Sequence, residues 1–244
     1  MQNLCNEGYY RHYRTGSGGI SYQDSEELKV FTKRLASQIK EKYHPQTVLD
    51  AGCAMGMLVA ALRDLGVEAY GVDLSEYAIS QVREDIRPYC AVGSLPSALP
   101  DSLPKRYDLV VSMEVLEHMP EEDAKKAVAN LCAVTDRVLF SSVPDDTEDP
   151  THINLHEPPY WCGLFSEQGL FFVGEEKPVF LTNYALFFQR KSMSASVELY
   201  ERKLQKDAEQ FLNLSLDLDE LQGELDVILE ELEHAKARGA KIYA

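Results

Sequence analysis

The chain has 244 residues, 45% hydrophobic and 26% charged, a composition typical of a globular protein with one sizeable domain and an appendage or with two small domains. It carries 24 Lys and Arg against 40 Asp and Glu, and this net charge of −16 argues against binding to nucleic acid or to anionic membranes. No apolar run approaches the roughly 18 residues of a membrane-spanning helix, and residues 1–14 lack the apolar core of a signal peptide. The five cysteines form no CxxC pair. We therefore expect a soluble cytoplasmic protein.

Strand-like and helix-like segments alternate along the first 190 residues. Residues 24–43 repeat apolar side chains at helical spacing, so we expect a helix that packs on a sheet. Further helices are predicted at 54–66, 75–87 (with Ser75 as the N-cap) and 121–134, and strands at 47–52, 67–73, 89–92, 107–113, 137–143, 170–173 and 185–190. This alternation predicts an α/β fold, a doubly wound, mostly parallel, seven-stranded Rossmann-like sheet with helices on both faces.

The composition changes near residue 192, where we place a boundary between a domain of residues 1–192 and a second segment, 193–244. From Val197 to Ala235, apolar residues recur in alternating steps of three and four, with Asp207 as the exception. This period predicts a long C-terminal coiled-coil helix. We expect it to form a homo-oligomer, with packing in a larger assembly or an intramolecular hairpin as alternatives. We also expect the chain to be the N-terminal piece of a longer protein, with the coil as a spacer.

A glycine-rich turn follows the first predicted strand, in the run VLDAGCAMG (48–56). Gly52 and Gly56 allow the backbone to turn sharply and to approach a ligand, and Asp50 can accept a hydrogen bond from an ammonium group. Asp73 ends the second predicted strand, where an acidic group suits a ribose diol. Each feature alone also fits a simple strand-end turn with an N-capping aspartate. Their order and spacing together favour a nucleoside site.

The segments VLDAGCAMG (48–56), VEAYGVDLSEYAI (67–79) and YDLVVSMEVLEHMP (107–120) resemble the class I S-adenosylmethionine (SAM)-dependent methyltransferases, over about Val48 to Arg190. The resemblance implies SAM as the cofactor, with its methionine end against Asp50, Gly52, Cys53, Ala54 and Gly56, its ribose on Asp73 and its adenine against Leu74. Members of the family often have an acidic residue near the third strand that meets the adenine amine. This chain has Gly93, Ser94 and Leu95 there, so we expect the backbone around Ser94 to make that contact. We also count Leu95 and Met113 among the cofactor-binding residues.

Three polar residues follow the fourth predicted strand at positions i, i+3 and i+4: Glu114, Glu117 and His118. A helical turn would place all three on one face, where they can bind a divalent cation. Alternatively, His118 can act as a general base oriented by a carboxylate. A structural interpretation also stands, in which Glu117 and His118 begin the helix after Pro120.

A second polar cluster lies in the loop predicted at 142–161, after the fifth parallel strand; it contains Asp149, His152, His156, Glu157 and Trp161. Polar groups beside an aromatic wall above the cofactor suit a sugar or another polyhydroxyl acceptor. The alternative is a solvated loop whose histidines cap the next helix.

The ExxEH pattern with downstream histidines resembles the metal-dependent small-RNA 2′-O-methyltransferases and the ubiquinone-pathway O-methyltransferases. This resemblance implies that Glu114, Glu117 and His118, with His152 or His156, coordinate a divalent cation such as Mg²⁺ or Mn²⁺. The acidic net charge argues against the RNA enzymes. The loop DPTHINLHEPPYW (149–161) looks more like bacterial O-methyltransferases from surface-polysaccharide gene clusters.

We therefore expect a SAM-dependent O-methyltransferase that acts on a glycan or a small polyhydroxylated acceptor. The base would be His118, His152 or His156, unless a cation lowers the pKa of the acceptor hydroxyl. Residues 8–22 would form a lid over the cofactor or a frayed terminus. The alternative from another class, a catalytically inactive coiled-coil scaffold, is disfavoured by the intact residues of the expected cofactor site.

Overall fold

A computed structural model describes residues 7–12, 25–174 and 177–191. The chain divides into two units, Met1–Lys191 and Ser192–Ala244. The predicted coiled coil, and the oligomer expected from it, lie outside the described residues. Among the residues that are described, no helix is long and apolar enough to cross a membrane.

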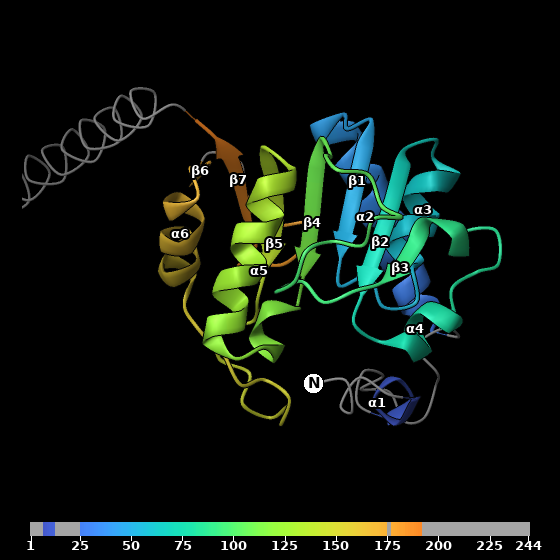
Figure 1. The fold of residues 1–244 in the computed structure, drawn as a ribbon, viewed down its shortest axis with the longest axis horizontal. Coiled ribbons are helices and arrows are strands. Elements are labelled where there is room, and N and C mark those ends of the chain that lie inside the picture. Colours follow the sequence, from blue (N-terminus) through green and yellow to red (C-terminus); the bar gives the residue numbers. More distant parts are fainter. Residues whose placement is uncertain (1–6, 13–24, 175–176, 192–244) are drawn as a thin grey trace, which may run out of the picture. The chain divides into compact units, whose positions relative to one another are not determined.

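One seven-stranded sheet forms the centre of the first unit (Figure 1). Its strands are β1 (Thr47–Ala51), β2 (Glu68–Asp73), β3 (Cys90–Val92), β4 (Leu109–Met113), β5 (Arg137–Ser141), β6 (Leu170–Phe172) and β7 (Leu186–Arg190). The spatial order is β3-β2-β1-β4-β5-β7-β6, with β1 to β5 parallel and with β7 antiparallel to both β5 and β6. The predicted seven-stranded, mostly parallel sheet is thus confirmed. Because the order reverses between β1 and β4, a ligand crevice is expected beyond their carboxyl ends.

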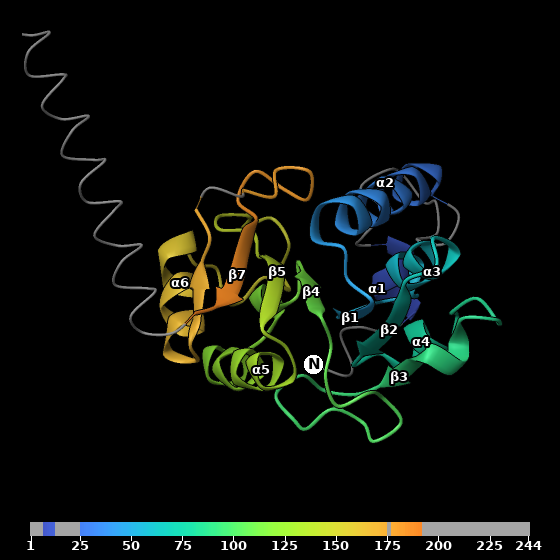
Figure 2. The same ribbon diagram turned by 90° about the horizontal axis from the view of Figure 1, so that it is seen from above.

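Helices cover both faces of this sheet (Figure 2). The helices of the described residues are α1 (Glu7–His12), α2 (Glu26–Tyr43), α3 (Met57–Asp64), α4 (Glu76–Ser80), α5 (Glu121–Val134) and α6 (Pro158–Glu167), with the 3₁₀ turns η1 (Arg87–Tyr89) and η2 (Leu116–His118). On one face, Ile39 of α2 and Leu62 of α3 are fully buried in one core. On the other face, Leu131 of α5 and Phe165 of α6 are fully buried in a second core. Each such side chain contributes about 1.5–3 kcal/mol through the removal of apolar surface from water.

The predicted helix at 75–87 is much shorter in the structure. Ser75 is its N-cap, as predicted, and its hydroxyl accepts a hydrogen bond from the Ala78 amide at 3.1 Å. The helix then ends at Ser80, although Val82 and Ile86 beyond it are still buried. A series of turns buries these two side chains, so the helical spacing of the apolar residues reflects burial and not a continuous helix.

Three further expectations are corrected. The predicted helix at 54–66 begins only at Met57, because the residues before it form the glycine turn. The loop predicted at 142–161 ends at Glu157, where two prolines start α6. Trp161, expected as an aromatic wall above the cofactor, is 1% exposed and packs in the core against Phe140, with ring centroids 5.1 Å apart. The apolar contacts of Trp161 therefore stabilise the α6 side of the sheet.

Candidate active site

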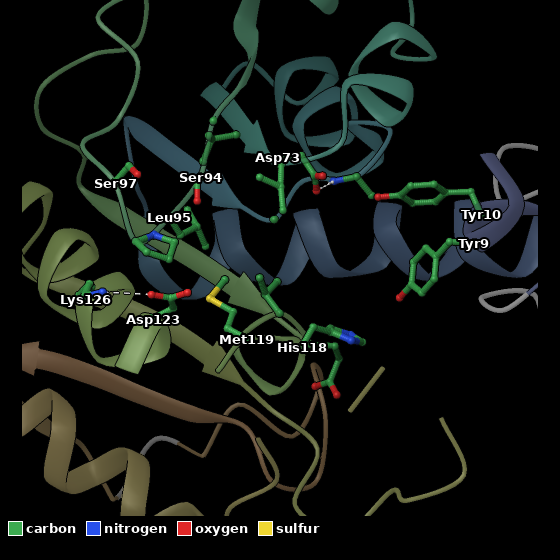
Figure 3. Close-up of a pocket in the computed structure, with 18 residues that line it drawn as sticks. Tyr9, Tyr10, Asp73, Ser94, Leu95, Ser97, His118, Met119, Asp123 and Lys126 are labelled. Atoms are coloured by element: carbon green, nitrogen blue, oxygen red, sulfur yellow. Dashed lines mark hydrogen bonds and ion pairs between the residues drawn. The ribbon is translucent and has the colours of Figure 1, made fainter. Parts of the chain in front are cut away.

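A cavity of about 480 Å³ lies at the carboxyl edge of the sheet (Figure 3). Its size is in the range of small-molecule sites. It is lined by Tyr9, Tyr10, Gly52, Ala54, Val72, Asp73, Leu74, Gly93, Ser94, Leu95, Pro96, Ser97, Glu114, Val115, His118, Met119, Asp123 and Lys126. Of the ten residues expected to bind the cofactor, the lining includes Gly52, Ala54, Asp73, Leu74, Ser94 and Leu95, but not Asp50, Cys53, Gly56 or Met113.

The glycine turn forms one wall of this cavity. Gly52 has a left-handed φ of +91°, and a β-carbon at this position would overlap the side chain of Val115. The amides of Gly52 and Cys53 donate to the Val72 carbonyl at 2.8 and 3.1 Å, which ties the turn to β2. Ala54 also has a positive φ, +48°, an uncommon conformation for a residue with a side chain. The turn is therefore held in a conformation that brings its backbone to the cavity.

Asp73 connects the glycine turn to the start of α4. Its Oδ2 accepts from the Ala54 amide and its Oδ1 from the Ser75 amide, both at 2.8 Å. A carboxylate can only accept hydrogen bonds when it is ionised, and the hydroxyls of a ribose are suitable donors to it. The two interpretations of Asp73, a turn-stabilising aspartate and a ribose ligand, are compatible in this geometry.

Asp50 lies behind the cavity wall. It is 5% exposed, and its burial, together with the nearby charge of Asp73, raises its pKa to about 7. Met113, at the end of β4, packs against the core on the α2 side. Cys53 lies against Gly71 of β2, and Gly56 is the N-cap of α3. None of these four residues lines the cavity, so their roles in cofactor binding stay predictions.

The loop after β3 forms the opposite wall and is held from α5. The side-chain amide of Asn130 donates to the Leu95 carbonyl at 2.8 Å and to the Ser97 carbonyl at 2.9 Å. Asp123 and Lys126, also of α5, pair at 3.1 Å and line the cavity beside this loop. Sequence reasoning missed both, because only the tertiary packing of α5 brings them there.

The predicted helical turn over 114–118 is only partly formed, because the 3₁₀ turn η2 includes Glu117 and His118 but not Glu114. Glu114 has a left-handed φ of +53° and lies outside η2. Its carboxylate accepts from the hydroxyls of Ser141 at 2.5 Å and Tyr184 at 3.2 Å. Burial and the neighbouring Glu114 raise the pKa of Tyr184, so its hydroxyl stays protonated and donates.

Three of the predicted polar residues converge beside the cavity. Glu117, His118 and His152 can each offer one ligand atom, and these atoms lie within 4.8 Å of one another. One carboxylate oxygen and two imidazole nitrogens form a donor set that suits a divalent cation, so the residues present fit such an ion. Glu114 is not in this group, and His156 instead stacks on Tyr160, with ring centroids 3.6 Å apart. The metal and base assignments themselves stay predictions.

The short helix α1 lies beyond the carboxyl ends of the strands (Figure 1). Tyr9 and Tyr10 are buried there and line the cavity, and the Tyr9 ring meets the His118 ring edge-on, with centroids 6.3 Å apart. The lid expected from residues 8–22 stays a prediction, because residues 13–22 lie outside the described residues.

The sequence is similar to those of known methyltransferases. A family model described as a methyltransferase domain matches residues 20–173. The magnesium-protoporphyrin O-methyltransferase of Synechocystis is 32% identical over 103 residues, 41% of this chain and 45% of the relative. The ubiquinone biosynthesis O-methyltransferase of Methylococcus capsulatus is 34% identical over 100 residues, 38% and 41% of the two chains. The matched stretches thus span less than half the length of these relatives.

Solved structures agree on the fold. The crystal structure of magnesium protoporphyrin IX methyltransferase from Synechocystis with bound SAM superimposes with a TM-score of 0.58 at 20% identity, over 78% of this chain and 95% of that one. A protein from Pyrococcus horikoshii superimposes with a TM-score of 0.56 at 18% identity, over 78% of this chain and 99% of that one. With the glycine turn, Asp73 and the family match over more than half of the sequence, the chain belongs to the class I SAM-dependent methyltransferases.

Proposed function

We propose that this protein is an O-methyltransferase that transfers the methyl group of SAM to a hydroxyl of a small acceptor. One observation carries the proposal: His118, which lines the cofactor cavity, also belongs to the cluster with Glu117 and His152. A hydroxyl is a weak acid, so its oxygen attacks a methyl group well only when a base or a cation assists the loss of its proton. The two relatives named above are O-methyltransferases by name, which supports the proposal.

Each wall of the cavity has a role in this reaction. SAM, when bound there, supplies a methyl carbon on a positively charged sulfur. Asp73 would accept hydrogen bonds from the ribose hydroxyls, and the glycine turn allows close approach of the backbone. Tyr9 and Tyr10, which line the cavity and are buried, would cover bound SAM and exclude water from it.

The acceptor hydroxyl would lie against the cluster of Glu117, His118 and His152. His118 would take its proton directly in one mechanism. In the other, these three residues would hold a divalent cation, which would lower the pKa of the hydroxyl. A glycan site was expected to have Trp161 as an aromatic wall, but this side chain is buried in the core and cannot contact an acceptor. We therefore propose a small hydroxylated acceptor, of which a sugar is one kind.

Calorimetric titration with S-adenosylhomocysteine, the demethylated product of SAM, tests the cofactor site. We expect Asp73→Ala to weaken binding at least tenfold, about 1.4 kcal/mol, because two hydrogen-bond acceptors for the ribose are lost. Asp101→Ala is the matched control, since Asp101 is an exposed aspartate paired with Lys105. Absence of binding to the folded wild-type protein would contradict the proposal.

A screen of hydroxylated acceptors with and without a chelator separates the two mechanisms. Loss of methyl transfer in chelator, restored by Mg²⁺ or Mn²⁺, supports the cation. Transfer that is insensitive to chelator but lost in His118→Ala supports the histidine base. Full activity of His118→Ala would rule out both roles for this residue.

A further inference from the structure

We infer that Asp149 and Thr151 are positioning residues for His118: through one chain of hydrogen bonds, they place the ring proton on Nδ1 and leave Nε2 with its lone pair. The inference rests on the proposed function, because it concerns the part that His118 plays there. Both residues lie in the loop between β5 and α6, and no residue of this loop lines the cavity.

The chain of hydrogen bonds starts at Asp149. Its Oδ1 accepts from the Thr151 hydroxyl at 2.6 Å and from the Thr151 amide at 2.8 Å. An ionised carboxylate can only accept hydrogen bonds, and a threonine hydroxyl has a single hydrogen. The hydroxyl hydrogen of Thr151 is therefore directed to Asp149.

The next bond fixes the histidine. Nδ1 of His118 lies 2.9 Å from Oγ1 of Thr151. Because the hydrogen of this hydroxyl points to Asp149, its oxygen can only accept here, so Nδ1 must carry the proton. A neutral imidazole has one N–H, so Nε2 is the unprotonated nitrogen and carries the lone pair. Either proposed role of His118, as a base or as a cation ligand, requires such a lone pair.

The same loop orients His152. Its Nδ1 lies 2.9 Å from the Asp146 carbonyl oxygen, which can only accept, so this ring also carries its proton on Nδ1. The two imidazole centroids are 4.8 Å apart. One loop thus supplies a hydrogen-bond acceptor to Nδ1 of both histidines.

The loop is fastened to the turn that carries His118. The amides of Ile153 and Asn154 donate to the Glu117 carbonyl at 2.9 and 3.0 Å. The buried side chain of Asn154 donates to the Leu116 carbonyl at 3.1 Å. These bonds hold Thr151 at a fixed place relative to His118, as is typical of partners that orient a functional histidine.

The test uses the full chain with histidine rings labelled with ¹⁵N, in chelator at neutral pH. Long-range ¹H–¹⁵N correlation spectra distinguish protonated from unprotonated ring nitrogens. We expect His118 of the wild type to be protonated on Nδ1 alone. Thr151→Ser keeps the hydroxyl and should keep this tautomer, whereas Thr151→Val removes the oxygen and should give a mixture with the Nε2–H form.

Kinetics supply the second readout. Thr151→Val should lower kcat about ten- to a hundredfold, the usual effect of losing an orienting partner, with little change in the KM for SAM. Thr151→Ser should keep most of the wild-type kcat. A wild-type His118 protonated on Nε2, or a Thr151→Val variant with unchanged tautomer and turnover, would overturn the inference.

Titration with S-adenosylhomocysteine keeps this test separate from that of the proposed function. If the wild type binds this ligand but the tautomer is wrong, only the inference fails. If the tautomer is as expected but no acceptor is ever methylated, the proposed reaction fails and the hydrogen-bond chain stands. The wild-type spectrum decides the inference even if the Thr151→Val variant does not fold.

Discussion

Gly52 is the residue at which the first turn comes closest to the segment after β4. Its left-handed φ disfavours any other residue, and the side chain of Val115 fills the place where a β-carbon would lie. The position of Gly52 directly after the first predicted strand indicated its role in a sharp turn. The sequence did not predict Val115 as the neighbour, because that contact joins residues far apart in the chain.

Gly52→Ala should therefore impair both stability and cofactor binding. We expect a loss of about 1–2 kcal/mol from the backbone conformation and a further loss from the overlap with Val115, together with at least tenfold weaker binding of S-adenosylhomocysteine. Gly66→Ala is the matched control, because Gly66 has a similar φ, +80°, but open space around it. Chemical denaturation and calorimetry measure the two effects. Equal binding losses in both variants would contradict the role of close approach.

Asp50 offers a test through pH. Burial, and secondarily Asp73, raises its pKa from 3.8 to about 7, so the folded protein favours the protonated form. The associated stabilisation is complete below pH 3.8, the pKa in the unfolded chain, and is lost as the pH rises through about 7. Asp50→Asn cannot ionise and should lose none of it.

Between pH 5 and pH 8, the stability of Asp50→Asn relative to wild type should rise by at most about 3 kcal/mol, because wild type loses about 1.4 kcal/mol per pH unit from pH 5 to about 7. Urea denaturation at several pH values gives this difference directly. Asp101→Asn, a change at an exposed aspartate, serves as the control and should show no such trend. A flat difference for Asp50→Asn would mean that Asp50 is ionised in the folded protein throughout this range.

Among the elements, the strands were predicted better than the helices. Each parallel strand is a short apolar run that can be recognised from its own few residues, and all of them appear in the sheet. The helix from Glu76 failed beyond Ser80, because tertiary burial of Val82 and Ile86 imitates helical periodicity. The start of α6 was overlooked although its two prolines are a typical signal for a first helical turn.

Helix α5 has a role that its sequence does not reveal. Its apolar face packs in the core, and Asn130 holds the loop that carries Leu95 and Ser97. This loop forms the wall where the family often has an acidic residue. The helix therefore supports the wall at the place where the chain departs from the family pattern.

Asn130→Ala should loosen this wall. We expect S-adenosylhomocysteine to bind several-fold more weakly, since each of two lost hydrogen bonds contributes about 0.5–1.5 kcal/mol to the ordered loop. Lys125→Ala, on the same helix but away from the cavity, should leave the affinity unchanged. Calorimetry on both variants makes the comparison. Unaltered binding in Asn130→Ala would show that the loop keeps its position without this anchor.

In the whole molecule, the candidate site is assembled from segments that are far apart in the sequence. The residues that line the cavity run from Tyr9 to Lys126, and the polar loop behind His118 ends before α6. Sequence reasoning located most of these segments, because the turns after the strands carry local signals. It could not decide between His152 and His156, since only the path of the loop brings His152 beside His118.

Residues 192–244 carry much of the negative charge, and their heptad spacing is the reason that we propose a homo-oligomer. A chain ended at Lys191 should therefore be smaller in light scattering than the full chain, by more than the mass removed. Its affinity for S-adenosylhomocysteine should be unchanged, because every described residue that lines the cavity precedes Lys191. The same number of chains per particle in both proteins would contradict an oligomer formed through residues 192–244. A loss of affinity on truncation would instead mean that assembly completes the site.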